Sequence, residues 1–507
     1  MTLANSKELE RMFIGESAEL KGKFNEVSIR FGVIGAGQKG NKDADILAGY
    51  TFSNGEQCYP SLAINLSESD MTHLKNIPQV DRIHFEGMKG AARTPQVVVD
   101  MFDPQHQNGQ AHQERLTGEI GRKFYDENGN PLIDQFLICL GAGGGVGTGW
   151  GSLVLNLIRN DYFAGVPVTL LISLPHGNPE EITNALVLLK ELEDFFKEQE
   201  TQYESNETKP LASVILVDNK RLYESFNERK DQHANKGKVI NWKEESNNAI
   251  LSTLHEVNLI PQNFGSDSVT YDPSDLIKLF SVPGRFLTLG KARLQPEDFT
   301  LNGLSSKVEG SLNRGYFACD HKFGTATMYG GFVLRPHDSE FFADMKTEEK
   351  LKDTLSKYKR LDEIGGKFGD PIWNQNYSVV YSIFAGMRIP NRYVQLANEL
   401  NELVEKQQRE QQEEEEVDVS IALNRIQNNS FNPYANTTGS RFNGPKQSAF
   451  TKQVAATVEK KGFGSNAFGS FGNKTSNTEQ QSSGNKFGQQ KTFNLSQHFV
   501  SKDNQNK

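Results

Sequence analysis

A loop with seven glycines in twelve residues, GAGGGVGTGWGS at positions 141–152, restricts the fold more than any other part of this 507-residue chain. It follows the apolar segment IDQFLICL and precedes the apolar segment LVLNLI. Each glycine at an ordinary helix start would cost roughly 0.5–1 kcal/mol relative to alanine. That cost is understandable where successive backbone N–H groups must approach a phosphate chain at a helix N-terminus. No lysine follows in the position that a Walker loop requires, so the pattern predicts a phosphate site of another kind.

A second glycine loop, GAGQKGN at Gly35–Asn41, follows the apolar segment FGVI and opens a helical pattern. Taken alone it is weak evidence, because it fits a dinucleotide-binding fingerprint equally well. A tight turn without a ligand is the other reading that the residues leave open. The two loops together favour a nucleotide site.

Short apolar runs alternate with amphipathic segments through the first half of the chain, which is typical of a parallel sheet covered by helices on both faces. The predicted strands of this α/β doubly wound domain are Val27–Ile34, Ser61–Asn65, Arg82–Phe85, Ile133–Leu140, Pro167–Leu174 and Leu211–Val217. A second, smaller α/β unit has predicted strands Arg285–Leu289, Thr325–Leu334 and Tyr377–Phe384. A long helix at Trp242–Val257 is expected between the two units.

The last helix is predicted to begin at Pro390, a residue suited to a first helical position. Beyond Glu405 its pattern is wholly polar, so any continuation is expected to be solvated. The predicted division of the chain is 1–26 as an N-terminal extension, 27–240 as the nucleotide-binding domain, 241–262 as the core helix, 263–388 as the second domain, 389–427 as the C-terminal helix and 428–507 as a disordered tail.

Charge is unevenly distributed along the chain. Residues 431–507 carry ten Lys and Arg against three acidic residues, although the whole chain has a net charge of −9. This tail is rich in Asn, Gln, Ser and Gly and is expected to be disordered. Three cysteines without paired spacing indicate neither a disulfide framework nor a zinc site. The N-terminus lacks a secretory signal, and no apolar run approaches the about 18–20 residues of a membrane span, so we expect a cytoplasmic protein.

Several motifs resemble those of the tubulin/FtsZ superfamily, in the family's order. GGGVGTG at Gly143–Gly149 is similar to the GGGTGTG or GGGTGSG signature, and GQKGN at Gly37–Asn41 to the tubulin GQxGN loop. DNKRLY from Asp218 resembles the base-binding DNxxLY. Within the superfamily, GAARTPQV from Gly90 and HEVNL from His255 look most like the TubZ branch of plasmids and phages. Val146 departs from the usual threonine and removes one hydroxyl near the phosphates.

The resemblance implies a tubulin/FtsZ fold, GTP or GDP as ligand with Mg²⁺ held mainly by phosphates and water near Gln38, and assembly of the chain with itself into filaments. The residues that it implies as nucleotide contacts are Gly37, Gln38, Lys39, Gly40, Asn41, Asn65, Gly90, Ala91, Arg93, Gly143, Gly144, Gly145, Val146, Gly147, Thr148, Gly149, Glu181, Asn219 and Asn248. No side chain is predicted as a direct metal ligand. Asn219 and Asn248 carry amides that can both donate to and accept from guanine.

Asp272 and Asp275, in YDPSDL, match the FtsZ element in which two acids act on the nucleotide of the next subunit. At i and i+3 both carboxylates lie on one face of a helix. The same residues also form a good helix start, with Asp as N-cap and Pro at the first position. The resemblance favours catalysis, and one acid can serve both purposes.

The resulting hypothesis is a GTPase that polymerises into dynamic filaments and hydrolyses GTP between subunits, for segregation of plasmid or phage DNA. The basic tail is then the predicted contact for a DNA-bound adaptor protein. The alternatives are a filament that positions a phage nucleus, as PhuZ does, a DNA-binding or replication protein with a vestigial nucleotide site, and an NAD-type oxidoreductase. The last requires an acidic residue at the end of the second strand, where Asn65 stands.

Overall fold

The computed structural model describes residues 24–85, 90–203, 209–233, 241–265, 269–282 and 285–428, without the side chains of 228–233 and 414–428. A first compact unit extends to Gln408, and a second begins at Arg409 within the last helix. The predicted tail and most of the N-terminal extension lie outside the described residues. Among those described, no helix combines the length and the apolar content that a membrane crossing requires.

The first unit is built on one sheet, whose order is β10-β8-β11-β7-β6-β5-β4-β1-β2-β3, with β9 paired to β8. Its strands are β1 Phe31–Ala36, β2 Ser61–Asn65, β3 Arg82–His84, β4 Gln135–Gly141, β5 Val168–Leu174, β6 Leu211–Asp218, β7 Arg285–Leu294, β8 Met328–Pro336, β9 Gly365–Gly369, β10 Ile372–Trp373 and β11 Ser378–Met387. Strands β1 to β6 are parallel, and β11 lies antiparallel between β7 and β8. The predicted nucleotide-binding domain and second domain therefore share one sheet, joined where Ser213–Ile215 of β6 pair with Arg285–Leu287 of β7.

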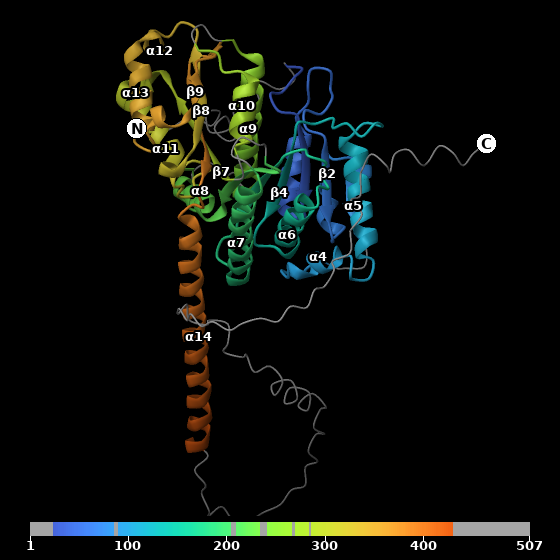
Figure 1. The fold of residues 1–507 in the computed structure, drawn as a ribbon. Coiled ribbons are helices and arrows are strands. Elements are labelled where there is room, and N and C mark those ends of the chain that lie inside the picture. Colours follow the sequence, from blue (N-terminus) through green and yellow to red (C-terminus); the bar gives the residue numbers. More distant parts are fainter. Residues whose placement is uncertain are drawn as a thin grey trace, which may run out of the picture. The chain divides into compact units, whose positions relative to one another are not determined.

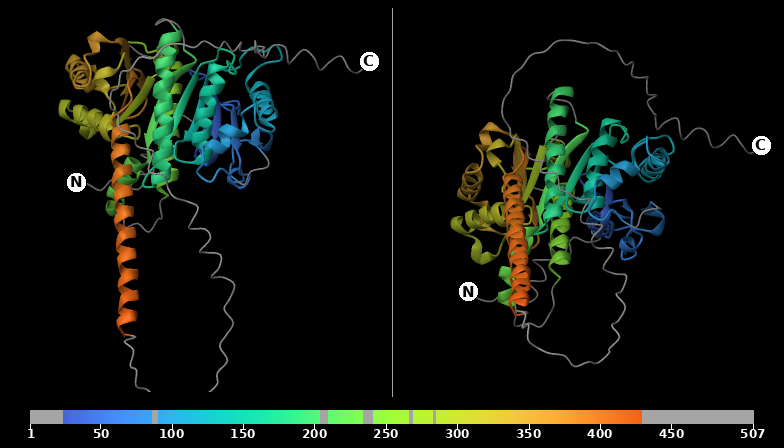
Figure 2. Two further views of the ribbon diagram at one scale, coloured as in Figure 1. Left: turned by 60° about the horizontal axis from the view of Figure 1, so that its bottom comes forward. Right: turned by 90° about the horizontal axis from the view of Figure 1, so that it is seen from below.

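Helices cover both faces of this sheet, and those of its two halves lie at opposite flanks: the cyan α5 on one side and the yellow α11 and α13 on the other (Figure 1). Figure 2 shows the same separation from two other directions. The helices are α3 Gly37–Ala48, α4 Gln96–Met101, α5 Gly109–Phe124, α6 Gly145–Arg159, α7 Pro179–Gln202, α8 Asn219–His233, α9 Trp242–Asn263, α10 Pro273–Phe280, α11 Leu301–Arg314, α12 Glu340–Ala343, α13 Met345–Ser356 and α14 Arg392–Asn428. Single 3₁₀ turns lie at Ser69–Met71, Gln79–Asp81, Pro296–Asp298, Phe323–Thr325 and Leu361–Glu363.

The core consists of two apolar clusters, one on each face of the sheet. In β4, Leu137 and Cys139 belong to one cluster, while Ile138 and Leu140 belong to the other. Because neighbouring side chains of a strand point to opposite faces, a strand covered on both sides must be apolar throughout. This explains the continuous apolar runs of the sequence and confirms the predicted parallel α/β sheet.

The structure corrects several predicted element ends. The first strand begins at Phe31 and not at Val27, because the preceding segment is bonded to helix α9: the Ile29 backbone N–H donates to the Asn258 side chain at 2.8 Å. Helix α9 continues past Val257 to Asn263, with Pro261 inside it. The last helix begins at Arg392 and not at Pro390. Its side chains from 405 to 413 are exposed, as the polar pattern predicted.

Candidate functional site

A cavity of about 540 Å³ lies at the carboxyl edge of the parallel strands, where β1, β2, β4 and β5 end. This edge is where ligands bind in open α/β sheets. The predicted nucleotide contacts that line it are Gly37, Gln38, Lys39, Asn65, Gly90, Ala91, Arg93, Gly143, Gly144, Gly145, Val146, Gly147, Glu181 and Asn219. Two glycine loops that are far apart in the sequence are thus brought to one cavity.

The glycines let the two loops approach each other closely. Gly37 has a φ of +70°, and a Cβ there would lie 3.1 Å from the Gly147 nitrogen. A Cβ on Gly147 would lie 2.3 Å from the Gly141 carbonyl oxygen. A side chain at position 37 would therefore crowd the second loop, and one at position 147 would collide with the backbone of its own loop.

Helices α3 and α6 both begin at this cavity, and neither has a side chain capping its N-terminus. In contrast, Asn178, Asn241 and Asp272 cap helices α7, α9 and α10. The first N–H groups of an uncapped helix still require acceptors and carry a partial positive charge. Two such ends at one cavity suit an extended anion such as a polyphosphate.

Basic side chains outnumber acidic ones around the cavity. Those that line it are the basic Lys39, Lys42, Arg93 and Lys243 and the acidic Asp70 and Glu181. Lys39 Nζ lies 2.5 Å from Oδ2 of the fully buried Asp43, which the sequence patterns did not indicate. Burial raises the pKa of the Asp43 carboxyl, an effect that the Lys39 charge opposes. The ion pair fixes Lys39 on the first turn of α3 beside the cavity.

The loop before α4 forms one wall of the cavity. Ala92 and Arg93 adopt left-handed φ angles of 42° and 63°. The Asn184 amide holds this loop against the second glycine loop by donating to the Arg93 carbonyl at 2.8 Å and to the Gly143 carbonyl at 3.1 Å. The start of this loop, 86–89, lies outside the described residues. The described part of this loop is therefore linked to the second glycine loop through the Asn184 side chain.

Aromatic and amide side chains gather at the other end of the cavity. Asn219, Trp242 and Asn247 line it there. The Tyr223 ring lies 5.1 Å from the His176 ring and 5.5 Å from the Trp242 ring, centroid to centroid. Aromatic rings and side-chain amides suit a purine base, which both stacks and forms hydrogen bonds.

Some predicted contacts do not line the cavity. Gly40, Asn41, Thr148 and Gly149 lie behind its wall in the first turns of α3 and α6, and Asn41 bonds to both the N–H and the carbonyl of Ile64. Asn247, and not the predicted Asn248, lines the cavity from α9. Successive residues of a helix point about 100° apart, so the element alone does not tell which asparagine faces a ligand. Further lining residues absent from the predicted set are Ala36, Lys42, Ser67, Asp70, Ala92, Gly141, Ser173, Pro175, Trp242, Lys243 and Asn247.

The predicted catalytic acids lie at the opposite edge of the sheet. They begin helix α10, whose last residue, Phe280, packs on Phe31 and accepts a 3.4 Å hydrogen bond from the Gln135 side chain. Phe31 and Gln135 are the first residues of β1 and β4, whereas the cavity lies where these strands end. In Figure 1, α10 lies at one end of the unit and α4 at the other. Helix α4 directly follows the loop that forms one wall of the cavity. Asp272 and Asp275 therefore do not meet the cavity of their own chain.

Comparison with known proteins gives a consistent result. The tubulin-like protein TubZ of Bacillus thuringiensis subsp. israelensis is 54% identical over 464 residues, which cover 89% of this chain and 94% of that protein. The chain belongs to the TubZ family. A family model described as the C-terminal domain of TubZ-like tubulin/FtsZ-like proteins matches residues 256–397.

Solved structures of the TubZ family share the fold. A GTPγS-form protofilament of TubZ from Bacillus thuringiensis serovar israelensis has a TM-score of 0.76 and 55% identity, covering 79% of this chain and 99% of that chain. A TubZ structure described as a protein of type III plasmid segregation has a TM-score of 0.72 and 54% identity, covering 80% and 98%. The predicted tubulin/FtsZ fold is thus confirmed.

Proposed function

We propose that this chain is a GTPase that assembles head to tail into dynamic filaments and hydrolyses GTP where one subunit meets the next. The observation that carries this proposal is the separation of a nucleotide cavity and an acidic helix start at opposite edges of one sheet. A contact that joins two different surfaces of identical subunits can repeat indefinitely, and it generates a filament where the rotation between subunits does not close a ring. The GTPγS-form protofilament of the TubZ relative supports this reading.

The cavity fits a guanine nucleotide in two parts. The uncapped starts of α3 and α6, with the basic side chains, would hold the phosphates. The side-chain amides of Asn219 and Asn247 would meet the base, because an amide can donate to the O6 atom of guanine and accept from its N1 and N2 groups.

The residues present also fit Mg²⁺. The described residues contain no cluster of three metal-binding side chains. The Asp70 carboxylate and the Gln38 amide line the cavity, and the Asn65 amide donates to Asp70 Oδ2 at 3.3 Å. Mg²⁺ commonly takes one or two protein ligands and completes its shell with phosphates and water. Bound there, it would neutralise phosphate charge, and Asp70 and Gln38 would hold it.

Hydrolysis needs a water molecule in line with the terminal phosphate. In the proposed filament, the α10 start of one subunit covers the cavity of its neighbour, and Asp272 and Asp275 orient that water. The site is incomplete in an isolated subunit, so assembly and hydrolysis are coupled.

Gly144→Val tests nucleotide binding and its link to assembly. A Cβ on Gly144 meets no atom within 4 Å, and its φ of −77° suits any residue, so the variant should fold. Because the added side chain occupies the cavity rim, we expect GTP affinity to fall about tenfold or more, corresponding to at least about 1.4 kcal/mol. Sedimentation with GTP, with ATP and without nucleotide gives the measurement. Wild type should pellet with GTP only, and the variant should stay in the supernatant.

Gly118→Val is the matched control, since Gly118 on α5 also has no atom within 4 Å of a built Cβ and does not line the cavity. It should pellet like wild type. Equal pelleting of wild type with ATP and GTP, or normal GTP affinity of Gly144→Val, would contradict the assigned site.

The proposed role of these filaments is segregation of plasmid or phage DNA in the bacterial cytoplasm. The TubZ relative described as a protein of type III plasmid segregation supports it. The basic tail, which begins at about Asn428, would contact a small DNA-bound adaptor protein or the DNA itself. Contacts of Lys and Arg with phosphate depend strongly on salt concentration.

Truncation after Asn428 should leave GTP-dependent polymer unchanged and abolish co-pelleting of the adaptor–DNA complex. The tail is basic, while the rest of the chain is acidic, so cargo is expected on the tail and assembly on the folded part. Co-pelleting over a salt series measures the attachment. Unchanged cargo binding, or loss of polymer, would show that the tail has another function.

A further inference from the structure

Helix α14 is anchored beside Asn219 of the cavity by a group of four charged side chains, of which Arg392 and Asp218 are buried. Arg392 Nε lies 2.6 Å from Asp218 Oδ2, and the side chains of Arg392 and Asp218 are 2% and 1% exposed. Arg392 also donates to Glu399, with distances of 2.7 Å and 3.1 Å from its two terminal nitrogens. Lys220 Nζ donates to the same Glu399 carboxylate at 2.7 Å. We call Asp218, Lys220, Arg392 and Glu399 the α14 ion-pair cluster.

The cluster holds both neighbours of Asn219. Asp218 is the last residue of β6, and its Oδ1 accepts a 3.1 Å hydrogen bond from the Lys220 backbone N–H, so it shapes the turn in which Asn219 stands. Asp218 is tied to Arg392 and Lys220 to Glu399, and both partners belong to α14. Asn219 thus lies between Asp218 and Lys220 in the sequence, and the side chains of both form ion pairs with residues of α14. Its own side chain lines the cavity.

We propose that Arg392 and Glu399 are positioning residues for base recognition, which set the direction of the Asn219 amide through Asp218 and Lys220. This inference rests on the proposed guanine nucleotide site and adds residues that lie outside the cavity. An amide discriminates between bases only while its donor and acceptor face the matching groups, because hydrogen bonds weaken steeply with misalignment.

Charged pairs that are buried together resist rearrangement more than exposed pairs. Removing one partner leaves the other buried without compensation, which costs more than loss of the pair's own attraction. The planar guanidinium of Arg392 bonds to two oxygens of Glu399 and also reaches Asp218, an arrangement that a lysine ammonium does not reproduce. Arg392→Lys therefore keeps the positive charge but loses the simultaneous contacts with both Glu399 oxygens and with Asp218.

The experiment measures the dissociation constants of GDP and IDP by displacement of a ribose-labelled fluorescent GDP. IDP carries hypoxanthine, which lacks the 2-amino group of guanine but keeps the same sugar and phosphates. Diphosphates avoid turnover during the measurement. Wild type should prefer GDP by about tenfold, which corresponds to one hydrogen bond.

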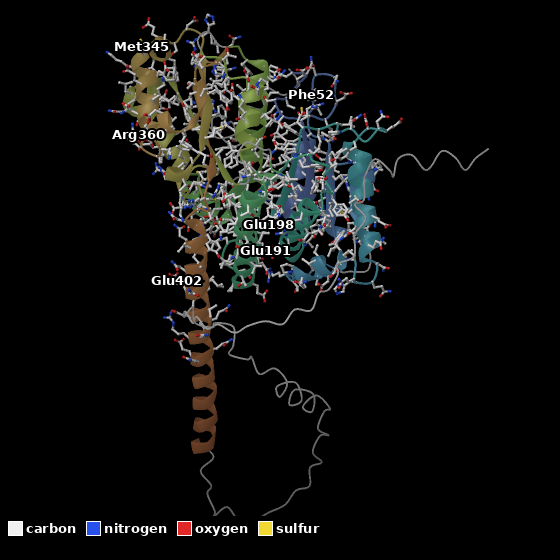
Figure 3. The ribbon with its side chains drawn as sticks, viewed as in Figure 1. Phe52, Glu191, Glu198, Met345, Arg360 and Glu402 are labelled. Carbon is white, nitrogen blue, oxygen red and sulfur yellow. The ribbon has the colours of Figure 1, made fainter. Side chains whose placement is uncertain are left out.

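In Arg392→Lys and Glu399→Gln the preference should fall to about twofold or less, while IDP affinity stays within about twofold of wild type. Glu402→Gln is the matched control: the same substitution on the same helix, at an exposed residue whose side chain is drawn in Figure 3. It should keep the wild-type preference. If Arg392→Lys fails to fold, the ratio of GDP to IDP affinity is measured in Glu399→Gln and in Lys220→Met instead. Lys220 is half-exposed, so its replacement should not prevent folding.

An unchanged GDP-to-IDP ratio in folded Glu399→Gln and Lys220→Met, with only a lower melting temperature, would overturn the positioning role and leave the cluster purely structural. A wild-type chain that binds neither GDP nor IDP would instead contradict the proposed nucleotide site. A fall in the affinity for both nucleotides by the same factor would also overturn the inference, because it would indicate a general loss of the cavity.

Discussion

Asp272→Ala and Asp275→Ala should each lower GTP hydrolysis by about 10²-fold or more while leaving GTP binding intact. Binding is retained because neither acid lines the cavity of its own chain. Hydrolysis falls because the neighbouring subunit no longer orients the attacking water. Filaments of these variants should persist, since GTP in them is not converted. Phosphate release and the lifetime of polymer after GTP addition measure the two effects.

A purely structural role of these acids makes a different prediction. The Asp272 side chain accepts from the Asp275 N–H at 3.2 Å, and Asp275 Oδ2 accepts from the Asp272 N–H at 3.2 Å, which forms a capping box at the start of α10. Loss of the cap costs about 1 kcal/mol of stability. Capping alone would therefore lower the melting temperature and leave turnover per folded molecule unchanged.

Asp272→Asn separates the two roles. Asparagine caps helices about as well as aspartate, so the variant should keep the wild-type melting temperature. It should nevertheless hydrolyse GTP as slowly as the alanine variant, because the charge is gone. The Ser274 hydroxyl, which donates to Asp272 Oδ1 at 2.6 Å, lowers the pKa of Asp272 and so favours an ionised carboxylate that accepts a hydrogen bond from water. Wild-type turnover in Asp272→Asn would rule out this role.

The two acids differ in their surroundings. Lys367 of β9 lies 2.5 Å from Asp275 Oδ2, while Asp272 contacts only groups of its own turn among the bonds described. Asp272 is thus the better placed to meet a neighbouring subunit, and Asp275 is held by the strand behind it. We expect the Asp272 variants to show the larger loss of hydrolysis.

The sequence predicted well those features that depend on the residue types and spacing within one short segment. The glycine loops were recognisable because their residues have few other uses, and the acid pair because its spacing and its proline define a helix start. Strand β2 is found at the predicted bounds, since its apolar centre Leu62–Ile64 is continuous, as in a strand covered on both faces.

Features that depend on distant partners were not predictable. The orientation of α9, which directs Asn247 and not Asn248 to the cavity, is set by packing along its whole length. Arg392 and Asp218 lie far apart in the sequence, and no local pattern indicates their ion pair. Strands β9 and β10 were missed because they are short and the first is rich in glycine, which disfavours strands.

Turnover of GTP per subunit should also depend strongly on protein concentration. The cavity is at one edge of the sheet and α10 at the other, so a complete site needs two subunits. Isolated subunits should bind GTP and hydrolyse it slowly. Above the concentration at which filaments form, every internal contact adds one complete site. Turnover per subunit should then rise by about the same 10² that the acids contribute.

This rise should depend on the acids and not on assembly alone. Asp272→Ala should form polymer at a similar concentration without the increase in turnover, because its filaments contain cavities but no complete site. A parallel increase in wild type and in Asp272→Ala would assign hydrolysis to residues of the cavity's own chain.

The central claim, that the active site is shared between subunits, is tested most directly by the rate of phosphate release per subunit measured from nanomolar to micromolar protein at saturating GTP. The shared site predicts a low, flat rate below a threshold concentration and a steep rise above it, with the threshold coinciding with the appearance of polymer in sedimentation. A rate per subunit that stays constant across the whole range would contradict it.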